Sequence, residues 1–284
     1  MDKLIINYAP VGMLMKKADT PNIPISVDEI VDDVRKAVEV GITSLHLHAR
    51  NEDETPCWNK ETFEQIILRV REFAPDLVIS VTTSGRVYNA LEKRSDVLNL
   101  EGPAKPDMAS LSLSSLNFNN TASVNAPDTI KALAEIMLKK GIRPELEAFD
   151  LGMINYAKYL IKKGYLTPPY YFNLIVGNIA CAQANLLHVG TMINDVPDDA
   201  IISLGGIGNN QLPINAMAIA MGYGVRIGLE DNIWFDENRT RLATNLECVQ
   251  RIHKLAKAIG RPICTSRELR EKLKLKPGFG EYGC

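Results

Sequence analysis

Short apolar runs alternate with longer amphipathic stretches along almost the whole chain. The short runs have the length and apolar content of β-strands, whereas the longer stretches repeat apolar residues with the period of an α-helix. Strands are predicted at residues 4–9, 44–49, 77–83, 108–114, 144–149, 171–176, 200–204 and 225–229. Because strands that alternate with helices indicate a parallel sheet, the pattern predicts an α/β protein.

Each predicted strand is followed by a predicted helix. The clearest helix starts with the capping-box pattern of Ser26 and Glu29 and ends at Gly41. The other helices are predicted at residues 59–73, 89–98, 125–141, 153–163, 181–189, 212–221 and 239–259, with an extra short helix at 265–275 before a tail that contains Gly and Pro.

Eight strand–helix units in one chain favour a TIM barrel, which is a (β/α)8 fold. We expect a single domain over residues 1–284, with a short C-terminal extension from about residue 261. A doubly wound open sheet has the same alternation of elements. The number of units and the lack of a GxGxxG motif after the first strand favour the barrel.

Composition narrows the class of partner. The chain has 284 residues, with 32 Lys and Arg against 34 Asp and Glu, so its formal net charge is −2. This balance argues against nucleic acid or an anionic membrane as the main partner. We find no apolar run of the roughly 18 residues that a membrane span needs, and no signal-peptide pattern at the start. The sequence therefore predicts a cytoplasmic protein.

The cysteines do not suggest a covalent or metal framework. They are odd in number, scattered and never in a CxxC pair, which argues against both a disulfide framework and a thiolate zinc site. The five are Cys57, Cys181, Cys248, Cys264 and Cys284.

Two histidines end the second predicted strand, where His46 and His48 alternate with leucines. The strand period of two places both imidazoles on one face, and barrel enzymes keep their chemistry at the C-terminal ends of strands. Taken alone, the pattern more often belongs to two core histidines hydrogen-bonded to their neighbours than to a metal site. Glu230 at the end of the eighth strand can complete a site with both histidines. Two imidazoles and a carboxylate are typical of catalytic zinc and of non-haem iron.

The supply of histidines limits the kind of metal site. The two others, His188 and His253, fall within predicted helices. A binuclear site of the amidohydrolase type needs further histidines at strand ends, so a mononuclear site remains.

Other strand ends carry polar groups with two interpretations each. The hydroxyls near Thr82 and Ser110 are either ligand contacts or half-buried fillers. Glu145 and Glu147 share one face of the fifth strand, and carboxylates paired in a core need a cation, a donor or a proton. The glycine turn after the seventh strand, at residues 205–208, is either a phosphate cradle or a tight turn.

Together these motifs give the chain a resemblance to the β-keto acid cleavage enzymes, whose prototype acts on 3-keto-5-aminohexanoate. The resemblance rests on HLHAR at residues 46–50, FDxGM at 149–153, GGIGNNQ at 205–211 and VRIGLEDN at 225–232. It extends over nearly the whole chain without large insertions.

The resemblance implies a zinc-dependent TIM barrel, usually a homotetramer. Such an enzyme condenses a β-keto acid with acetyl-CoA and releases acetoacetate and a new CoA thioester. By position, His46, His48 and Glu230 would hold one zinc ion per chain, and Asp231, held by Arg226, would take the α-proton. The resemblance also implies that Thr82, Ser110 and Glu147 contact the keto acid. From the turn alone, we expect Gly205, Gly206 and Gly208 to contact the CoA ester.

One position departs from the family pattern. Leu14 stands in the loop after the first strand, where the aminohexanoate enzyme is expected to have a glutamate that meets the substrate ammonium. An ammonium without a counter-charge in a dry pocket is unfavourable by several kcal/mol. We therefore expect a keto acid with a neutral or apolar side chain, or an acidic one if Arg86 or Lys16 reaches it.

Two other functions remain compatible with the residues. Another mononuclear metal barrel, such as a hydrolase or a divalent-metal aldolase, would react without a thioester. A non-catalytic scaffold would gain nothing from burying Arg226, Glu230 and Asp231 with two histidines, because buried charge destabilises unless it is paired.

Overall fold

The structure, a computed structural model, describes residues 1–276, and its centre is a closed barrel of parallel strands. The barrel strands are β1 (Ile6–Tyr8), β2 (Ser44–Leu47), β5 (Val78–Val81), β6 (Met108–Ser112), β9 (Arg143–Ala148), β10 (Tyr170–Val176), β11 (Ala200–Gly206) and β12 (Gly224–Ile227). Their order around the barrel is β1-β12-β11-β10-β9-β6-β5-β2, and β2 pairs with β1 to close it. The (β/α)8 prediction is confirmed, and the open sheet is excluded.

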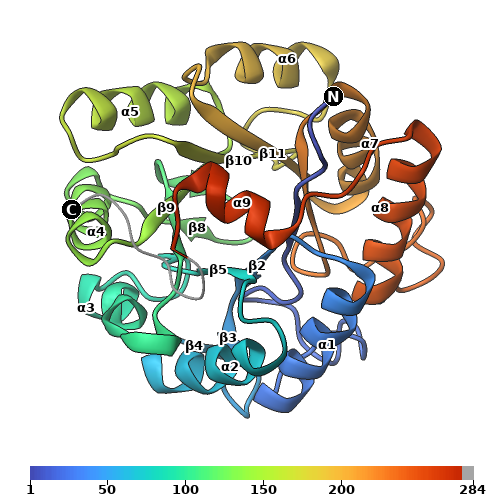
Figure 1. The fold of residues 1–284 in the computed structure, drawn as a ribbon, viewed down its shortest axis with the longest axis horizontal. Coiled ribbons are helices and arrows are strands. Elements are labelled where there is room, and N and C mark those ends of the chain that lie inside the picture. The colour runs from blue at the N-terminus through green and yellow to red at the C-terminus, as the bar shows by residue number, and fades with distance from the viewer. Residues whose placement is uncertain (277–284) are drawn as a thin grey trace.

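Helices surround the barrel on its outside, as Figure 1 shows. The helices around the barrel are α1 (Val27–Val40), α2 (Lys60–Phe73), α3 (Leu91–Ser95), α4 (Pro127–Lys140), α5 (Leu151–Lys162), α6 (Leu186–Asp195), α7 (Gln211–Met221) and α8 (Asn245–Ile259), and a ninth, α9 (Ser266–Leu273), is placed differently. In α1 the expected capping box is present, and Ile30, Val34 and Ala37 are buried against the barrel at helical spacing. None of the described helices has the length and apolar content to cross a membrane.

Short elements complete the described chain. They are the antiparallel pairs β3 (Ala49–Arg50) with β4 (Pro56–Cys57) and β7 (Leu116–Asn117) with β8 (Ala122–Ser123), and the 3₁₀ turns η1 (Asp96–Asn99), η2 (Gly102–Ala104) and η3 (Gly208–Asn210). The four described cysteines are free thiols. Cys284 and the expected Gly- and Pro-containing tail lie outside the described residues.

Three predicted helices have different boundaries in the structure. The helix expected at 181–189 is α6, which begins later because the Asn185 side chain caps it. The helix expected from Arg239 is α8, which begins at Asn245 behind the capping box of Thr244 and Glu247. The stretch at 89–98 divides into the short helix α3 and the 3₁₀ turn η1.

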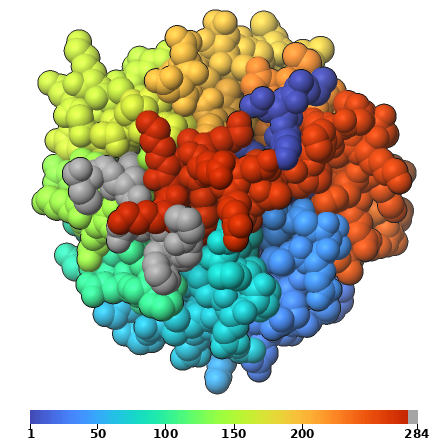
Figure 2. Space-filling view, viewed as in Figure 1, coloured from blue at the N-terminus to red at the C-terminus, as the bar shows by residue number. Residues whose placement is uncertain are grey.

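The extra helix α9 lies across one end of the barrel. Figures 1 and 2 show it in red over the centre of the molecule, with the N-terminal residues beside it. Leu269 and Leu273 of α9 pack on Ile5 and Val78 of the barrel. Arg270, which is 1% exposed, donates to the buried carboxylate of Asp107 at 2.8 Å. This end is the N-terminal end of the strands, so the opposite end, where function is expected, is left for the site.

Candidate active site

His46 lies in β2 and His48 directly follows this strand. Both side chains point into the barrel interior and meet there. His46 is 1% exposed, and its Nε2 lies 3.2 Å from Nε2 of His48. Leu45 and Leu47 face the other side and are fully buried in the core. The alternation that the sequence predicts is therefore present, and it brings two imidazole nitrogens within contact of each other.

A buried carboxylate fixes the orientation of the first imidazole. Oε2 of Glu145, from β9, lies 2.8 Å from Nδ1 of His46, and Asn7 donates to the other oxygen at 2.7 Å. Ser80 and Asn173 also donate to this carboxylate. Burial raises the pKa of Glu145, but His46, Arg226 and the Ser80 hydroxyl outweigh burial and lower the pKa to about 2. With an ionised acceptor at Nδ1, the proton of neutral His46 belongs on Nδ1, and Nε2 keeps its lone pair for a ligand.

Glu230 completes the group from the end of the eighth strand. Its carboxylate oxygens lie 3.3 Å from Nε2 of His48 and 3.8 Å from Nε2 of His46. Arg226 binds the same carboxylate at 2.7 Å. Two glycines leave room for this placement: a Cβ on Gly12 would lie 2.7 Å from Cγ of Glu230, and Gly228 has φ +148° where a Cβ would meet the Ala9 backbone oxygen.

These three side chains fit a divalent cation. One donor atom from each of His46, His48 and Glu230 lies within 4.8 Å of the others. Ligand bonds of about 2.0–2.1 Å in tetrahedral geometry separate donors by about 3.3 Å, close to the spacings found here. In addition, Oε2 of Glu230 is buried without a hydrogen-bond partner, although buried polar atoms are almost always paired.

The contact expected between Arg226 and Asp231 is present beside this group. Nε of Arg226 lies 2.9 Å from Oδ2 of Asp231. Burial raises the pKa of Asp231 and Arg226 opposes that rise, with the net change upward. Arg226 lowers this pKa, but the loss of water around Asp231 and the nearby carboxylate of Glu230 outweigh it. A carboxylate with a raised pKa is a stronger base than an exposed one.

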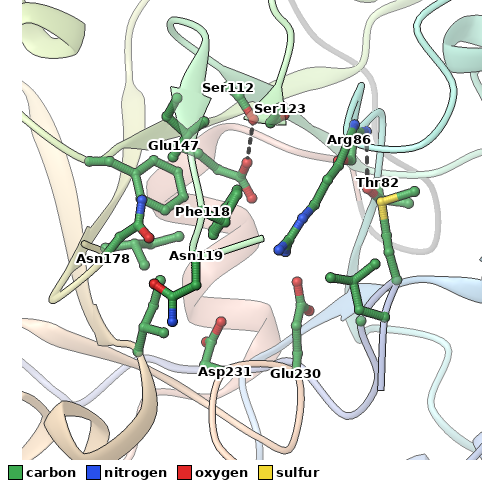
Figure 3. A pocket seen from close by; sticks show the side chains of 18 of the residues that line it. Thr82, Arg86, Ser112, Phe118, Asn119, Ser123, Glu147, Asn178, Glu230 and Asp231 are labelled. Carbon is green, nitrogen blue, oxygen red and sulfur yellow. Dashed lines mark hydrogen bonds between the residues drawn. The ribbon is translucent and has the colours of Figure 1, made fainter. Parts of the chain in front are cut away.

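A cavity of about 350 Å³ opens above these residues at the C-terminal ends of the strands. Its size is that of a small-molecule site. Figure 3 shows Glu230 and Asp231 on one side of it, with Glu147 and Ser112 opposite. Thr82 and Leu14 also line it, as expected. Ser112 donates to Glu147 at 2.7 Å, and burial raises the pKa of Glu147.

Four residues expected near ligands lie elsewhere. Ser110 is 2% exposed and its hydroxyl accepts from the backbone N–H of Thr83, while Ser112 is the hydroxyl of that strand that lines the cavity. The three glycines of the turn after β11 are likewise absent from the lining in the described residues. Gly205 packs against Arg226, Gly206 lies against the Asn210 backbone, and Gly208 donates its N–H to the Asp231 carbonyl.

Several residues that line the cavity were not predicted from the sequence. Phe118, Asn119 and Asn120 come from the turn between β7 and β8, and Asn178 and Ile179 follow β10. Loop asparagines are too common for residue type alone to identify them. Their position directly after predicted barrel strands was the available signal.

Sequence comparisons agree with this geometry. Residues 3–275 match the sequence profile of the family described as beta-keto acid cleavage enzyme. The chain belongs to the β-keto acid cleavage enzyme family. It is 36% identical over 274 residues to the 3-keto-5-aminohexanoate cleavage enzyme of Acetoanaerobium sticklandii, covering 96% of this chain and 98% of that protein. It is 35% identical to the 3-oxoadipate:acetyl-CoA acetyltransferase of Cupriavidus necator, covering 95% of this chain and 94% of that protein.

Comparison with solved structures supports the same barrel. The structure described as the ternary complex of ObcA with C4-CoA adduct and oxalate superposes with a TM-score of 0.78 at 20% identity, covering 91% of this chain and 68% of that one. At that identity the likeness concerns the fold. Family membership makes this protein an enzyme and disfavours the scaffold and the unrelated hydrolase or aldolase.

Proposed function

We propose that this protein condenses a β-keto acid with acetyl-CoA and releases acetoacetate and a new acyl-CoA. The observation that carries the proposal is the contact of two groups at the base of one cavity: the cluster of His46, His48 and Glu230, and the pair of Arg226 and Asp231. The names of the relatives, a β-keto acid cleavage enzyme and an acetyl-CoA acetyltransferase, support the same reaction.

We assign His46, His48 and Glu230 as the ligands of one zinc ion. A bound divalent ion supplies Lewis-acid stabilisation of the negative charge that develops when a β-keto acid loses an α-proton. Zinc is proposed over iron on the family resemblance, since two imidazoles and a carboxylate suit both.

Asp231 is proposed as the base that takes this α-proton. Its carboxylate lines the cavity, and Arg226 holds it from behind through Nε. A positioned base of this kind contributes about 100- to 10,000-fold to a rate. The carbanion equivalent then forms a bond to the thioester carbonyl of acetyl-CoA and expels CoA thiolate. The thiolate adds to the ketone of the original keto acid, the bond from that carbon to the α-carbon breaks, and the α-carbon takes the proton back, which gives acetoacetate and the new acyl-CoA. The nucleophiles are the substrate carbanion and CoA, so the reaction needs no nucleophilic side chain of the protein.

Arg226 also has a donor available for the substrate. Its Nη1 is buried and without a hydrogen-bond partner, 4.0 Å from Glu147, while Nε and Nη2 are occupied by Asp231 and Glu230. We propose that Nη1 and the hydroxyl of Thr82 hold the oxygens of the keto acid. Leu14 in the lining makes an ammonium group on the substrate unfavourable.

The proposal includes a homotetramer in the cytoplasm, as the family resemblance implies. One structural feature supports association of subunits. Three large apolar side chains before and at the start of α6 are highly exposed: Ile179 at 68%, Leu186 at 77% and Leu187 at 75%. Exposed apolar patches commonly mark contact surfaces. Light scattering of the purified protein measures the number of subunits.

Two measurements test the proposed function together. Metal analysis of the purified protein should give about one zinc per chain, and incubation with acetyl-CoA and a panel of β-keto acids should yield acetoacetate. Metal-free protein should yield none until zinc is restored. Turnover of a substrate without any thioester would instead indicate a hydrolase or an aldolase.

A further inference from the structure

The cavity has two cationic side chains in its lining, and they differ in their surroundings. Arg226 contacts the carboxylates of Glu230 and Asp231 and lies 4.0 Å from Glu147. Arg86, from the loop after β5, has no carboxylate within 4.0 Å among the described residues. The Glu230 carboxylate attracts this guanidinium only from beyond that distance. Arg86 therefore lacks a carboxylate in direct contact, which is the partner that a ligand carboxylate would supply.

Arg86 is held in place rather than free to swing into solvent. Its guanidinium carbon lies 3.7 Å from the ring centroid of Phe118, and its Nε donates to Oγ1 of Thr121 at 3.0 Å. Neither Nη atom has a hydrogen-bond partner in the described part of the chain. Stacking on an aromatic ring leaves the planar edge of a guanidinium available, and that edge binds carboxylates through two parallel hydrogen bonds.

The direction of this side chain places its free edge over the site. Figure 3 shows Arg86 extending into the cavity toward the side on which Glu230 and Asp231 lie. Half-buried surroundings strengthen its attraction for an anion, because water screens it less than at the surface. They also lower its pKa, although a guanidinium stays charged at neutral pH.

We propose that Arg86 binds a second carboxylate, at the far end of the β-keto acid, so that the substrates are β-keto dicarboxylic acids. This inference rests on the proposed function and specifies its substrate class. The first carboxylate and the ketone belong beside Arg226 and the cluster of His46, His48 and Glu230, where Asp231 reaches the α-carbon. The distal carboxylate then meets the one guanidinium of the lining that has no carboxylate within 4.0 Å among the described residues.

The test compares two acids of equal length that differ in distal charge. The probes are 3-oxohexanedioate and its 6-methyl ester, each with acetyl-CoA and the zinc-loaded enzyme. Charge-assisted hydrogen bonds of this kind correspond to about 10- to 100-fold in binding. We expect kcat/KM for the diacid to exceed that for the ester by about 30-fold, and 5-amino-3-oxohexanoate to react more slowly than both.

The substitution Arg86→Gln should reduce this preference to about one by raising KM for the diacid. Arg86→Lys should restore part of it, because charge returns without the planar fork. Arg69→Gln, on the exposed face of α2, is the matched control and should keep the preference. Phe118→Leu gives a second route to the same conclusion: the charge stays but loses its support, so KM should rise more for the diacid than for the ester.

Three results would overturn the inference while the proposed function stood. The first is acetoacetate formation that favours the ester or the amine over the diacid. The second is an equal effect of Arg86→Gln on the diacid and the ester. The third is an effect of Arg86→Gln mainly on KM for acetyl-CoA, which would assign Arg86 to the CoA ester. Absence of acetoacetate from every acid in the panel would overturn the proposed function itself.

Discussion

Oε2 of Glu145 lies 2.8 Å from Nδ1 of His46, and both side chains are almost completely buried. Glu145 comes from β9 and His46 from β2, two strands that are far apart in the sequence. The carboxylate therefore determines both the orientation of this imidazole ring and the nitrogen that carries its proton.

The substitution Glu145→Gln should weaken zinc binding by about 10- to 100-fold, because partners behind a metal ligand have effects of this size. The amide keeps the shape of the side chain but lacks the charge that makes the imidazole a better donor. Competition with a chromophoric chelator measures the affinity. Glu61→Gln, an exposed carboxylate on α2, is the control. Equal affinities of the wild type and Glu145→Gln would show that this contact has no such role.

The substitution Asp231→Asn should keep zinc and lose about 100- to 10,000-fold in kcat, since Asn cannot accept the α-proton. His46→Ala should lose both the metal and the activity. Acetoacetate formation and metal content per chain, measured on the same preparations, separate the two roles. An active Asp231→Asn enzyme would require another base.

The contact between α9 and the barrel gives a stability prediction. Arg270→Met should lower the free energy of unfolding by about 3–5 kcal/mol, because Asp107 would stay buried with one cation fewer. Arg267→Met on the same helix removes a surface pair with Asp76 and should change it by only about 0–1 kcal/mol. Urea denaturation measures both. Similar losses in the two variants would contradict a specific role for the buried ion pair.

Asp33 gives a prediction for pH. Burial raises its pKa to about 6, against a reference value of 3.8, although it accepts a hydrogen bond from Tyr8. The folded state therefore keeps a proton that the unfolded chain has lost, and its stabilising effect is present at about pH 4 and is lost as the pH rises through 6. Over this range the free energy of unfolding should fall by about 3 kcal/mol from this group.

The variant Asp33→Asn should lack this contribution, so its stability relative to the wild type should increase from pH 4 to pH 7. Asp32→Asn, at the neighbouring exposed position, is the charge-matched control. Denaturation curves at several pH values in this range give the comparison. Parallel pH profiles for the wild type and Asp33→Asn would contradict the prediction.

The sequence predicted the barrel and the centre of the site because both follow from strand periodicity. His46 and His48 share a face by the period of two, and parallel strands bring Glu230 and Asp231 to the same end of the barrel as the histidines. Helix starts that depend on one side-chain hydrogen bond, such as that of Asn185 in α6, were displaced because several residues nearby could serve as caps.

The substrate end of the cavity could not be predicted to the same degree. Ser110 and Ser112 are two positions apart on one strand and share a face, so pattern alone cannot say which of them lies at the depth of the cavity. The contact of Arg86 with Phe118 joins two loops that are distant in the sequence and have no periodicity. Such contacts depend on how the loops pack, which residue type does not encode.

The missing side chain at Gly12 bears on any attempt to change the substrate preference of this enzyme. Gly12 lies only two positions from Leu14 in the same loop, and a methyl group at Gly12 would displace Glu230. Random libraries that span this loop would therefore lose most of their active members at Gly12 for a reason unrelated to specificity. Mutagenesis that varies Leu14 and leaves Gly12 fixed would explore new side chains on the keto acid while the arrangement of His46, His48 and Glu230 stays intact.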